Sequence, residues 1–589
     1  MNIATEILRN DSASLAFVDV DDRHPPVLYR DIGPLLDELA EQANLPELLR
    51  SARVALIMPR GKDGLLGFLA VSSYAICCPL DPRLLDDELI DAIRDLNVTA
   101  IVDGTGEPRI ESIAERLKIG IRRLRVPERA SKRPLKSEIG RTRANEIALL
   151  LQTSGTTSKP KHVALTHSNV LAAARAIGTS YAISPRDLCI NPMPHHHVHG
   201  LISAGTSSLL AGASQYCAPS FSPKVFDKAM ELLNPTWFTG SPAFHLGLLD
   251  FFKAAGRTPA TRSLRFVRSS SAPFPASAIA QYERLFGVPL LENYGMTETA
   301  STVCSNLPPP GLRKPGSVGC PIIGAEIRIV DASGDELSAG SEGEVLLRGP
   351  SVITRYASGE SGADHFMDGW LLTGDVGRVD EDGCLFILGR TKELIKRGGH
   401  SVYPLEVDSA ILSYPDVTEA ISFSLVHPTL GEELVAAFVP RAGSTVDGDN
   451  LRQFLERKIS TYKIPAAIVR VGEIPKSATG KSARRAMRAA FAGEFALKSV
   501  APRCEIETAL LKAWMRVNDV PGLGVTDNLF VHGSDPIRAQ RVCDDLRQRH
   551  GVDLSLKDII RNPTVRMQAS LVSSKAGPDA LSPLTELPK

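Results

Sequence analysis

The sequence lacks an excess of charge of either sign. Its 589 residues include 67 lysine and arginine residues and 67 aspartate and glutamate residues. A chain without net charge has no bulk field that would attract nucleic acid or an anionic membrane, so neither is an expected partner. The expected ligand is a small molecule.

Disulfide and export signals are lacking as well. The nine cysteines are odd in number and scattered, and no C-x-x-C pair occurs, which is typical neither of a disulfide framework nor of a zinc site. The N-terminus has no basic segment followed by an apolar run, and polar residues interrupt the most apolar stretch, 65–80. We therefore expect a soluble, cytoplasmic protein in a reducing compartment.

The length predicts several domains, since one hydrophobic core cannot serve 589 residues. Short β-branched runs such as 54–58 and 76–80 alternate with helical patterns, which indicates βαβ units and a parallel sheet. From about residue 503 the pattern becomes purely helical. We predict an α/β core over 1–388, a smaller α+β unit over 389–495, a linker over 496–502, an all-α four-helix domain over 503–575 and a disordered tail over 576–589.

A run of small hydroxyl residues follows the apolar strand predicted over 147–151. Its backbone N–H groups and hydroxyls can wrap phosphate groups, and a lysine at its end can supply positive charge. It is not a Walker A loop, because the G-x-x-x-x-G-K-[ST] pattern is absent here. Taken alone, the run fits a solvated surface loop equally well. The residues concerned are Thr153, Ser154, Gly155, Thr156, Thr157 and Lys161.

Further motifs follow in a fixed order. They read YGMTET over 294–299, WLLTGD over 370–375, GRTKELI over 389–395 and PKSATGK over 475–481. Together with the TSGTT loop they resemble the adenylate-forming (AMP-binding) superfamily of acyl-CoA synthetases, nonribosomal peptide adenylation domains and luciferases. The resemblance covers nearly all of 20–490 and implies a large N-terminal core with a small mobile C-terminal subdomain. The family pattern has glycines where this chain has Ser158 and His162.

The resemblance implies a site for ATP and Mg²⁺. Adenine would lie beside the segment Ser271, Ala272 and Pro273, while Asn293 contacts the purine edge and Tyr294 stacks on its face. Gly295 and Met296 continue this element. Thr297 would bind the α-phosphate and Glu298 would hold Mg²⁺, a hard ion that prefers oxygen ligands.

The resemblance also implies residues for the ribose and for catalysis. Asp375 and Arg390 would contact the ribose hydroxyls, and Lys392 would serve as the hinge of the mobile subdomain. Lys481 would be the catalytic lysine, whose charge offsets the repulsion between a carboxylate and a phosphate. Rotation about Lys392 would remove Lys481, let Gly398, Gly399 and His400 face the active site and open a passage for a pantetheine thiol.

The segment 193–200, MPHHHVHG, matches M-P-x-x-H-x-H-G of acyl-CoA synthetases, in which His197 gates the acyl pocket. Its four histidines cannot all converge on one ion from an extended segment, which disfavours a metal site. No aspartate follows to pair a substrate ammonium, so an α-amino acid is not expected. Segments 268–272 and 305–319 look most like those of oxalate–CoA ligases, which implies a small or polar acid. We expect pocket walls at 237–244, Arg268 and 299–303.

The helical domain resembles a peptidyl or acyl carrier protein in segments 527–537 and 562–565. Pro536 occupies the position of the serine that receives phosphopantetheine. Proline suits the first turn of a helix but has no hydroxyl, so we expect no covalent phosphopantetheine. Ser534 lies two residues early and is expected to point elsewhere. The domain would then serve docking or stability.

The predicted function is ATP-dependent activation of a small carboxylic acid to acyl-AMP, with release of pyrophosphate and acyl transfer to a thiol. The thiol would be coenzyme A or the pantetheine of a separate carrier protein, and other biosynthetic enzymes are possible partners. Two alternatives stay open. One is transfer to an amine; the other is a nucleotide-binding pseudoenzyme that acts as a scaffold, which Ser158, His162 and Pro536 favour.

Overall fold

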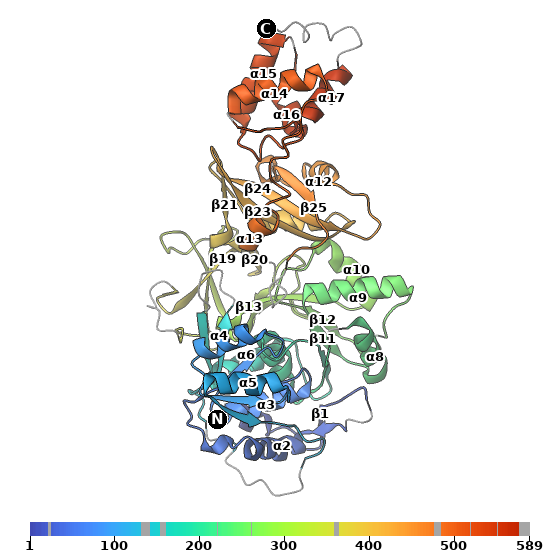
Figure 1. The fold of residues 1–589 in the computed structure, drawn as a ribbon. Coiled ribbons are helices and arrows are strands. Elements are labelled where there is room, and N and C mark those ends of the chain that lie inside the picture. Colours follow the sequence, from blue (N-terminus) through green and yellow to red (C-terminus); the bar gives the residue numbers. More distant parts are fainter. Residues whose placement is uncertain are drawn as a thin grey trace. The chain divides into compact units, whose positions relative to one another are not determined.

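The computed structural model describes residues 1–589 except 22–24, 131–138, 140–141, 154–160, 221, 261, 358–364, 476–483, 519, 551 and 576–589. The chain divides into two compact units, Met1–Ile387 and Leu388–Lys589 (Figure 1). The predicted loop residues Ser154, Gly155, Thr156 and Thr157, the predicted catalytic Lys481 and the predicted tail lie outside the described residues.

A six-stranded sheet in the first unit has the order β6-β5-β3-β4-β7-β8. β3 runs parallel to β4 and β5, whereas β7 and β8 are antiparallel. The predicted strands over 54–58 and 76–80 correspond to β3 and β4. The six strands are β3 (Arg53–Ile57), β4 (Ile76–Leu80), β5 (Ala100–Asp103), β6 (Gly120–Arg123), β7 (Ile147–Thr153) and β8 (Lys161–Thr166).

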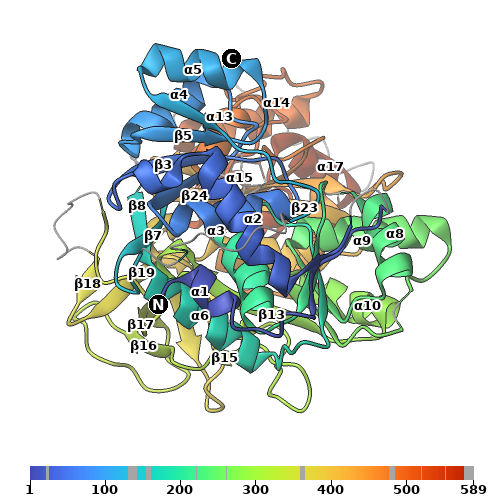
Figure 2. The ribbon, with the colours of Figure 1, turned by 90° about the horizontal axis from the view of Figure 1, so that it is seen from below.

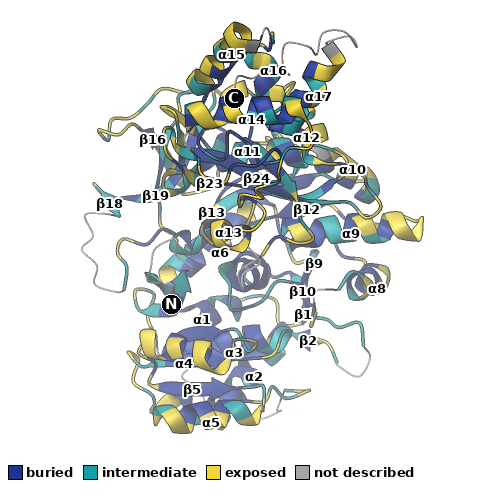
Figure 3. Ribbon diagram, turned by 45° about the horizontal axis from the view of Figure 1, so that its top comes forward, coloured by how far each residue is buried: buried dark blue, intermediate teal, exposed yellow. Residues whose placement is uncertain are grey.

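Helices cover both faces of this sheet, and for that reason β3 is a continuous apolar run. Ala55 and Ile57 pack in one cluster with the helices α4 (Asp86–Asp95) and α5 (Pro108–Leu117). Val54 and Leu56 pack in another with α2 (Tyr29–Gln42) and α3 (Lys62–Ser72). Figure 2 shows α4 and α5 side by side, and Figure 3 shows their exposed residues on the outer surface.

A nine-stranded sheet has the order β15-β14-β13-β12-β11-β9-β10-β1-β2. Its central strands β9 to β13 are parallel, so the carboxyl ends of β11, β12 and β13 meet at one edge, where ligands of α/β proteins bind. The strands are β1 (Leu15–Phe17), β2 (Val27–Leu28), β9 (Leu188–Asn191), β10 (Ser214–Cys217), β11 (Trp237–Gly240), β12 (Phe266–Ser269), β13 (Leu290–Met296), β14 (Ser301–Ser305) and β15 (Cys320–Pro321).

The remaining elements of the first unit complete its core. A further sheet contains β16 (Glu326–Val330), β17 (Gly343–Arg348), β18 (Phe366–Met367) and β19 (Trp370–Val379). A π-helix covers His199–Thr206. The other helices are α1 (Ile3–Ile7), α6 (His167–Ser180), α7 (Ser207–Leu210), α8 (Pro223–Leu233), α9 (Pro242–Ala255) and α10 (Ala276–Phe286).

The second unit combines a mixed sheet with a helical domain. β20 (Leu385–Arg390) pairs with β19 in the preceding sheet and leads into the second unit. The sheet of the second unit contains β21 (Ile395–Arg397), β22 (His400–Val402), β23 (Val417–His427), β24 (Gly431–Pro440) and β25 (Ala467–Arg470). Its helices are α11 (Pro404–Leu412), α12 (Gly448–Leu455), α13 (Arg484–Ala490), α14 (Glu505–Asn518), α15 (Pro536–His550), α16 (Leu556–Arg561) and α17 (Val565–Lys575). One apolar cluster joins Phe423 and Phe491 to Trp514 and Leu529, so the helical domain packs on this subdomain.

Among the described helices, none combines the length and the apolar character that a bilayer-spanning helix needs.

Candidate active site

The turn after β13 has a fixed backbone. A side chain at Gly295 would place its Cβ 1.6 Å from the carbonyl oxygen of Ser301, so glycine is required there. The Thr299 hydroxyl accepts a hydrogen bond from the Met296 N–H at 3.0 Å and donates to the Ser301 carbonyl at 2.7 Å. Thr297 and Glu298 are therefore held in a short 3₁₀ turn at the carboxyl end of the strand.

Tyr294 and Asp375 lie together, although 81 residues separate them. The Tyr294 hydroxyl donates to Asp375 Oδ2 at 2.5 Å, and Asp375 is only 4% exposed. Burial, followed by the charge of Asp375, raises the pKa of Tyr294 well above its usual value, so the phenol remains a donor. The structure thus joins the residue predicted for the base to one predicted for the ribose.

The segment after β12 lies beside Asn293. The Asn293 side chain donates to the Ser269 carbonyl at 2.9 Å and accepts from the Ser270 hydroxyl at 2.8 Å. Ser271 has a φ of +78°, a left-handed conformation that is unusual for a residue with a side chain. Ser271, Ala272 and Pro273 are exposed at this edge of the sheet, next to the residue predicted to contact the purine.

Lys161 and Glu298 share one tyrosine. The Tyr356 hydroxyl donates to Glu298 Oε1 at 2.9 Å, and Lys161 Nζ lies 4.8 Å from the centroid of the Tyr356 ring. Lys161 Nζ also lies 3.4 Å from His365 Nδ1, and the rings of His365 and Tyr356 are 5.2 Å apart. The sequence identified Lys161 and Glu298 but missed Tyr356 and His365, because no motif relates positions so far apart.

This arrangement fits a magnesium ion shared with a nucleotide. Mg²⁺ is usually bound by one or two carboxylates together with phosphate oxygens and water. Glu298 supplies such a carboxylate, oriented by the Tyr356 hydroxyl. In the described part of the chain, no group of three or more His, Cys, Asp or Glu side chains is placed to hold a metal.

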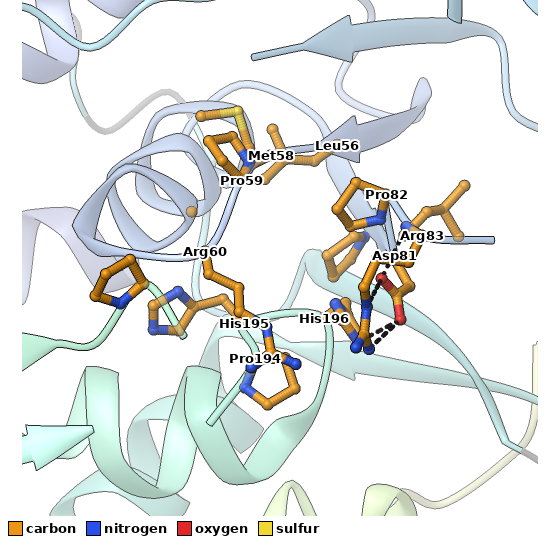
Figure 4. A pocket seen from close by; sticks show the side chains of 14 residues that line it. Leu56, Met58, Pro59, Arg60, Asp81, Pro82, Arg83, Pro194, His195 and His196 are labelled. Carbon is orange, nitrogen blue, oxygen red and sulfur yellow. Dashed lines mark hydrogen bonds and ion pairs between the residues drawn. The ribbon is translucent and has the colours of Figure 1, made fainter. Parts of the chain in front are cut away.

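The histidines of MPHHHVHG divide between two places. His195 and His196 line a cavity of about 210 Å³ together with Arg60, Asp81 and Arg83 (Figure 4). Burial lowers the pKa of His195 to about 4 and that of His196 to about 3, so both are neutral near pH 7.

His199 lies in the other place. Its Nδ1 is 3.1 Å from the Ser271 hydroxyl, and its Nε2 is 2.7 Å from the Thr239 hydroxyl. His197, the predicted gate, is half-buried, and its ring lies 4.4 Å from that of His196. The four rings therefore do not share one centre.

The predicted residues of the second unit lie where it begins. Arg390 is the last residue of β20, and Lys392 is exposed in the 3₁₀ turn Thr391–Glu393. Gly398 and Gly399, which follow β21, have φ angles of +55° and +84°. These backbone conformations suit glycine at the turn predicted to face the active site after rotation.

The carrier-like domain begins its helix α15 at Pro536. The preceding Asp535 accepts the Arg538 N–H at 2.9 Å through Oδ1 and the Thr429 hydroxyl at 3.0 Å through Oδ2. Ser534 is fully buried, and its hydroxyl has no hydrogen-bond partner in the part of the chain that the structure describes. A phosphopantetheine arm would be attached at this end of the domain. This end contacts the neighbouring subdomain and has no exposed hydroxyl at position 534 or 536.

Comparisons with known proteins agree with this geometry. Family models match for the AMP-binding enzyme over residues 29–357, for its C-terminal domain over 406–481 and for the phosphopantetheine attachment site over 508–572. A probable CoA ligase of Humulus lupulus is 40% identical over 60% of this chain and 68% of its own length. Oxalate–CoA ligase of Saccharomyces cerevisiae is 32% identical over 82% of this chain and 96% of its own length.

A solved structure extends the likeness to the fold. ATP-bound MatB from Rhodopseudomonas palustris superposes with a TM-score of 0.75 at 28% identity, over 83% of this chain and 99% of its own. These findings confirm the predicted α/β fold with its C-terminal helical domain. The chain belongs to the AMP-binding enzyme family, as an adenylate-forming acid–thiol ligase with a carrier-type domain at its C-terminal side.

Proposed function

We propose that the chain activates a small acid with a second polar or acidic group and transfers its acyl group to coenzyme A. The convergence of Lys161 and Glu298 on Tyr356 carries the proposal, because it gathers one cation and one carboxylate at a single point. The yeast relative named for oxalate and CoA, which is matched over 96% of its length, supports both the acid class and the acceptor.

The first step joins two anions. The carboxylate oxygen of the acid attacks the α-phosphorus of ATP, the bond from that phosphorus to the bridging oxygen breaks, and pyrophosphate leaves with the electron pair. Lys161 offsets the phosphate charge, and Glu298 would hold Mg²⁺, which neutralises phosphate oxygens when bound. In the proposal Lys481 adds a second positive charge in this conformation, and His197 gates the acyl pocket.

Nucleotide binding is assigned to the turn after β13 and its neighbours. Tyr294 would stack on adenine, Asn293 would contact its edge, and Asp375 with Arg390 would hold the ribose. The hydrogen bond from Tyr294 to Asp375 fixes the ring relative to the carboxylate, which favours one orientation of the nucleoside. The remaining contacts are assigned to the phosphate loop over 153–157, to Ser271, Ala272 and Pro273, and to Gly295, Met296 and Thr297.

The second step takes the acyl group to a thiol. The sulfur attacks the acyl carbon, and AMP leaves with the electrons of the mixed anhydride bond. Rotation of the second unit about Lys392 would exchange Lys481 for the turn at Gly398. Because Pro536 has no hydroxyl and Ser534 is buried, the chain's own carrier-type domain offers no arm for this step, which supports free coenzyme A as the acceptor.

Product analysis tests the proposal. Incubation with ATP, Mg²⁺, coenzyme A and either oxalate or malonate should yield AMP, pyrophosphate and the matching acyl-CoA, resolved by liquid chromatography and mass spectrometry. Release of ADP and phosphate would contradict the adenylate route. Bound ATP without product from any acid would favour the scaffold alternative.

A further inference from the structure

Arg268, the third residue of β12, is fully buried and has no carboxylate partner among the described residues. Its Nε donates to the Thr239 hydroxyl at 3.3 Å, and its Nη1 donates to the Ser203 carbonyl at 3.2 Å. Among the described residues, buried Nη2 has no well-aligned hydrogen-bond partner, although the Tyr181 hydroxyl lies near the guanidinium. A guanidinium keeps its charge in proteins, so this positive charge is uncompensated within the described chain.

The surroundings of this charge do not compensate it. Its guanidinium carbon lies 5.5 Å from the ring centre of Tyr181 and 5.7 Å from that of Trp237. The face of an aromatic ring attracts a cation, but a buried carboxylate attracts it more strongly. Burial, followed by the charge of Arg268, holds the pKa of His199 well below its usual value, so that ring is neutral. Among the described residues, the cluster thus has one positive charge and no negative one.

A chain of hydrogen bonds links Arg268 to the candidate active site. Arg268 Nε is bonded to the Thr239 hydroxyl, which lies 2.7 Å from His199 Nε2. The other nitrogen of His199 lies 3.1 Å from the hydroxyl of Ser271, which is exposed at the edge of the sheet. The guanidinium is therefore separated from the site edge by only two side chains.

We propose that Arg268 is the specificity residue that binds the second acidic group of the substrate acid. Arginine suits this task because its planar fork matches a carboxylate or sulfonate in a bidentate way. A diacid would supply the missing negative charge and a partner for Nη2, whereas a monoacid of equal length would leave both unmet. The inference rests on the proposed function, and it names the chemical class of the acid: a short dicarboxylic or sulfocarboxylic acid.

The alternative is a structural arginine, held by the aromatic rings and the strand. The two roles differ in one property, the preference between matched acids. Replacing a structural arginine would change kcat and KM for diacids and monoacids alike. Replacing a residue that binds the acid would change them for the diacid and leave them unchanged for the monoacid.

The test measures kcat and KM for malonate against propanoate and for succinate against butanoate, in the full-length chain and in Arg268→Met. We expect the wild type to prefer the diacids. In Arg268→Met this preference should fall about 10- to 100-fold, the range for a hydrogen-bonded charge, mainly through a higher KM for the diacid. Arg268→Lys keeps the charge but not the fork, and should fall between the two.

Arg265→Met is the matched control. Arg265 directly precedes β12, stacks over Phe266 at 5.4 Å, pairs with Asp187 at 3.2 Å and donates to the Tyr181 carbonyl at 3.0 Å. Its removal should leave the diacid preference intact.

A second readout does not depend on turnover. Malonate with AMP should raise the melting temperature of the wild type but not that of Arg268→Met. Without ligands, Arg268→Met should melt at a temperature no lower than the wild type, because a lone buried charge has been removed. If Arg268→Met does not fold, Arg268→Lys decides, because a binding role predicts that it weakens the diacid preference and leaves the turnover of propanoate and butanoate unchanged.

Equal losses with both acids in Arg268→Met would overturn the inference while the proposed function stands, whereas a wild type that prefers monoacids would contradict the acid class that both assign. Absence of activity with every acid would refute the proposed function itself.

Discussion

Replacing Tyr294 by phenylalanine separates stacking from orientation in the nucleotide site. The change keeps the ring but removes the hydroxyl that donates to Asp375 at 2.5 Å. A buried hydrogen bond to a charged group contributes about 1.5–3 kcal/mol. Because Asp375 is 4% exposed, water replaces this donor poorly, and we expect the free energy of unfolding to fall by that amount. If Asp375 also holds the ribose, the KM for ATP should rise by about tenfold or more.

The assay combines chemical denaturation with the ATP dependence of pyrophosphate exchange. Tyr29→Phe is the matched control, since the buried Tyr29 hydroxyl lies 2.8 Å from the Ala213 carbonyl and 3.0 Å from the Leu209 carbonyl, and contacts no candidate site residue. The control should lose about 1 kcal/mol of stability, as for a bond to a neutral acceptor, and keep its KM for ATP. A Tyr294→Phe variant that is destabilised but has an unchanged KM for ATP would refute the assignment of this pair to the nucleotide site.

Three further predictions concern other parts of the chain. Tyr356→Phe keeps the ring beneath Lys161 but frees the carboxylate of Glu298, so we expect kcat to fall about tenfold with a higher magnesium requirement; an unchanged magnesium titration would contradict the metal assignment. Burial raises the pKa of Glu292 from 4.5 to about 7, so the protonated form is favoured in the fold and its stabilising effect is lost as pH rises from 4.5 through 7. Denaturation across this range should show a loss of up to about 3 kcal/mol that Glu292→Gln lacks, and identical pH profiles would refute it. Incubation with a phosphopantetheinyl transferase and coenzyme A should leave the mass of the chain unchanged; a phosphopantetheine adduct within 503–575 would show that another residue replaces Pro536.

Elements with a strong local signal were predictable. The run over 54–58 is apolar on both sides because helices cover both faces of the sheet, and it forms β3 as the pattern predicts. The YGMTET motif over 294–299 likewise marked a local element, and the structure gives the reason for its glycine, since the Ser301 carbonyl approaches Gly295 too closely for any side chain. In both cases neighbouring residues hold the information.

Long-range contacts were not predictable in the same way. Tyr356 reaches Glu298 across 58 residues, and no periodicity or motif relates the two positions. The sequence placed Arg268 in a pocket wall, but its lack of a counter-charge within the described chain emerges only when β11, β12 and the π-helix are packed together. Likewise, MPHHHVHG is one segment in sequence, yet its rings face two different places because the chain turns into a helix at His199.

The most direct test of acid activation is acid-dependent exchange of labelled pyrophosphate into ATP, measured across mono- and dicarboxylates, aryl acids and amino acids. We predict exchange with short diacids, little with α-amino acids, and none in Lys481→Ala, whose ATP binding should persist. Exchange that is absent with every acid, or that is unchanged in Lys481→Ala, would contradict the proposed adenylation mechanism.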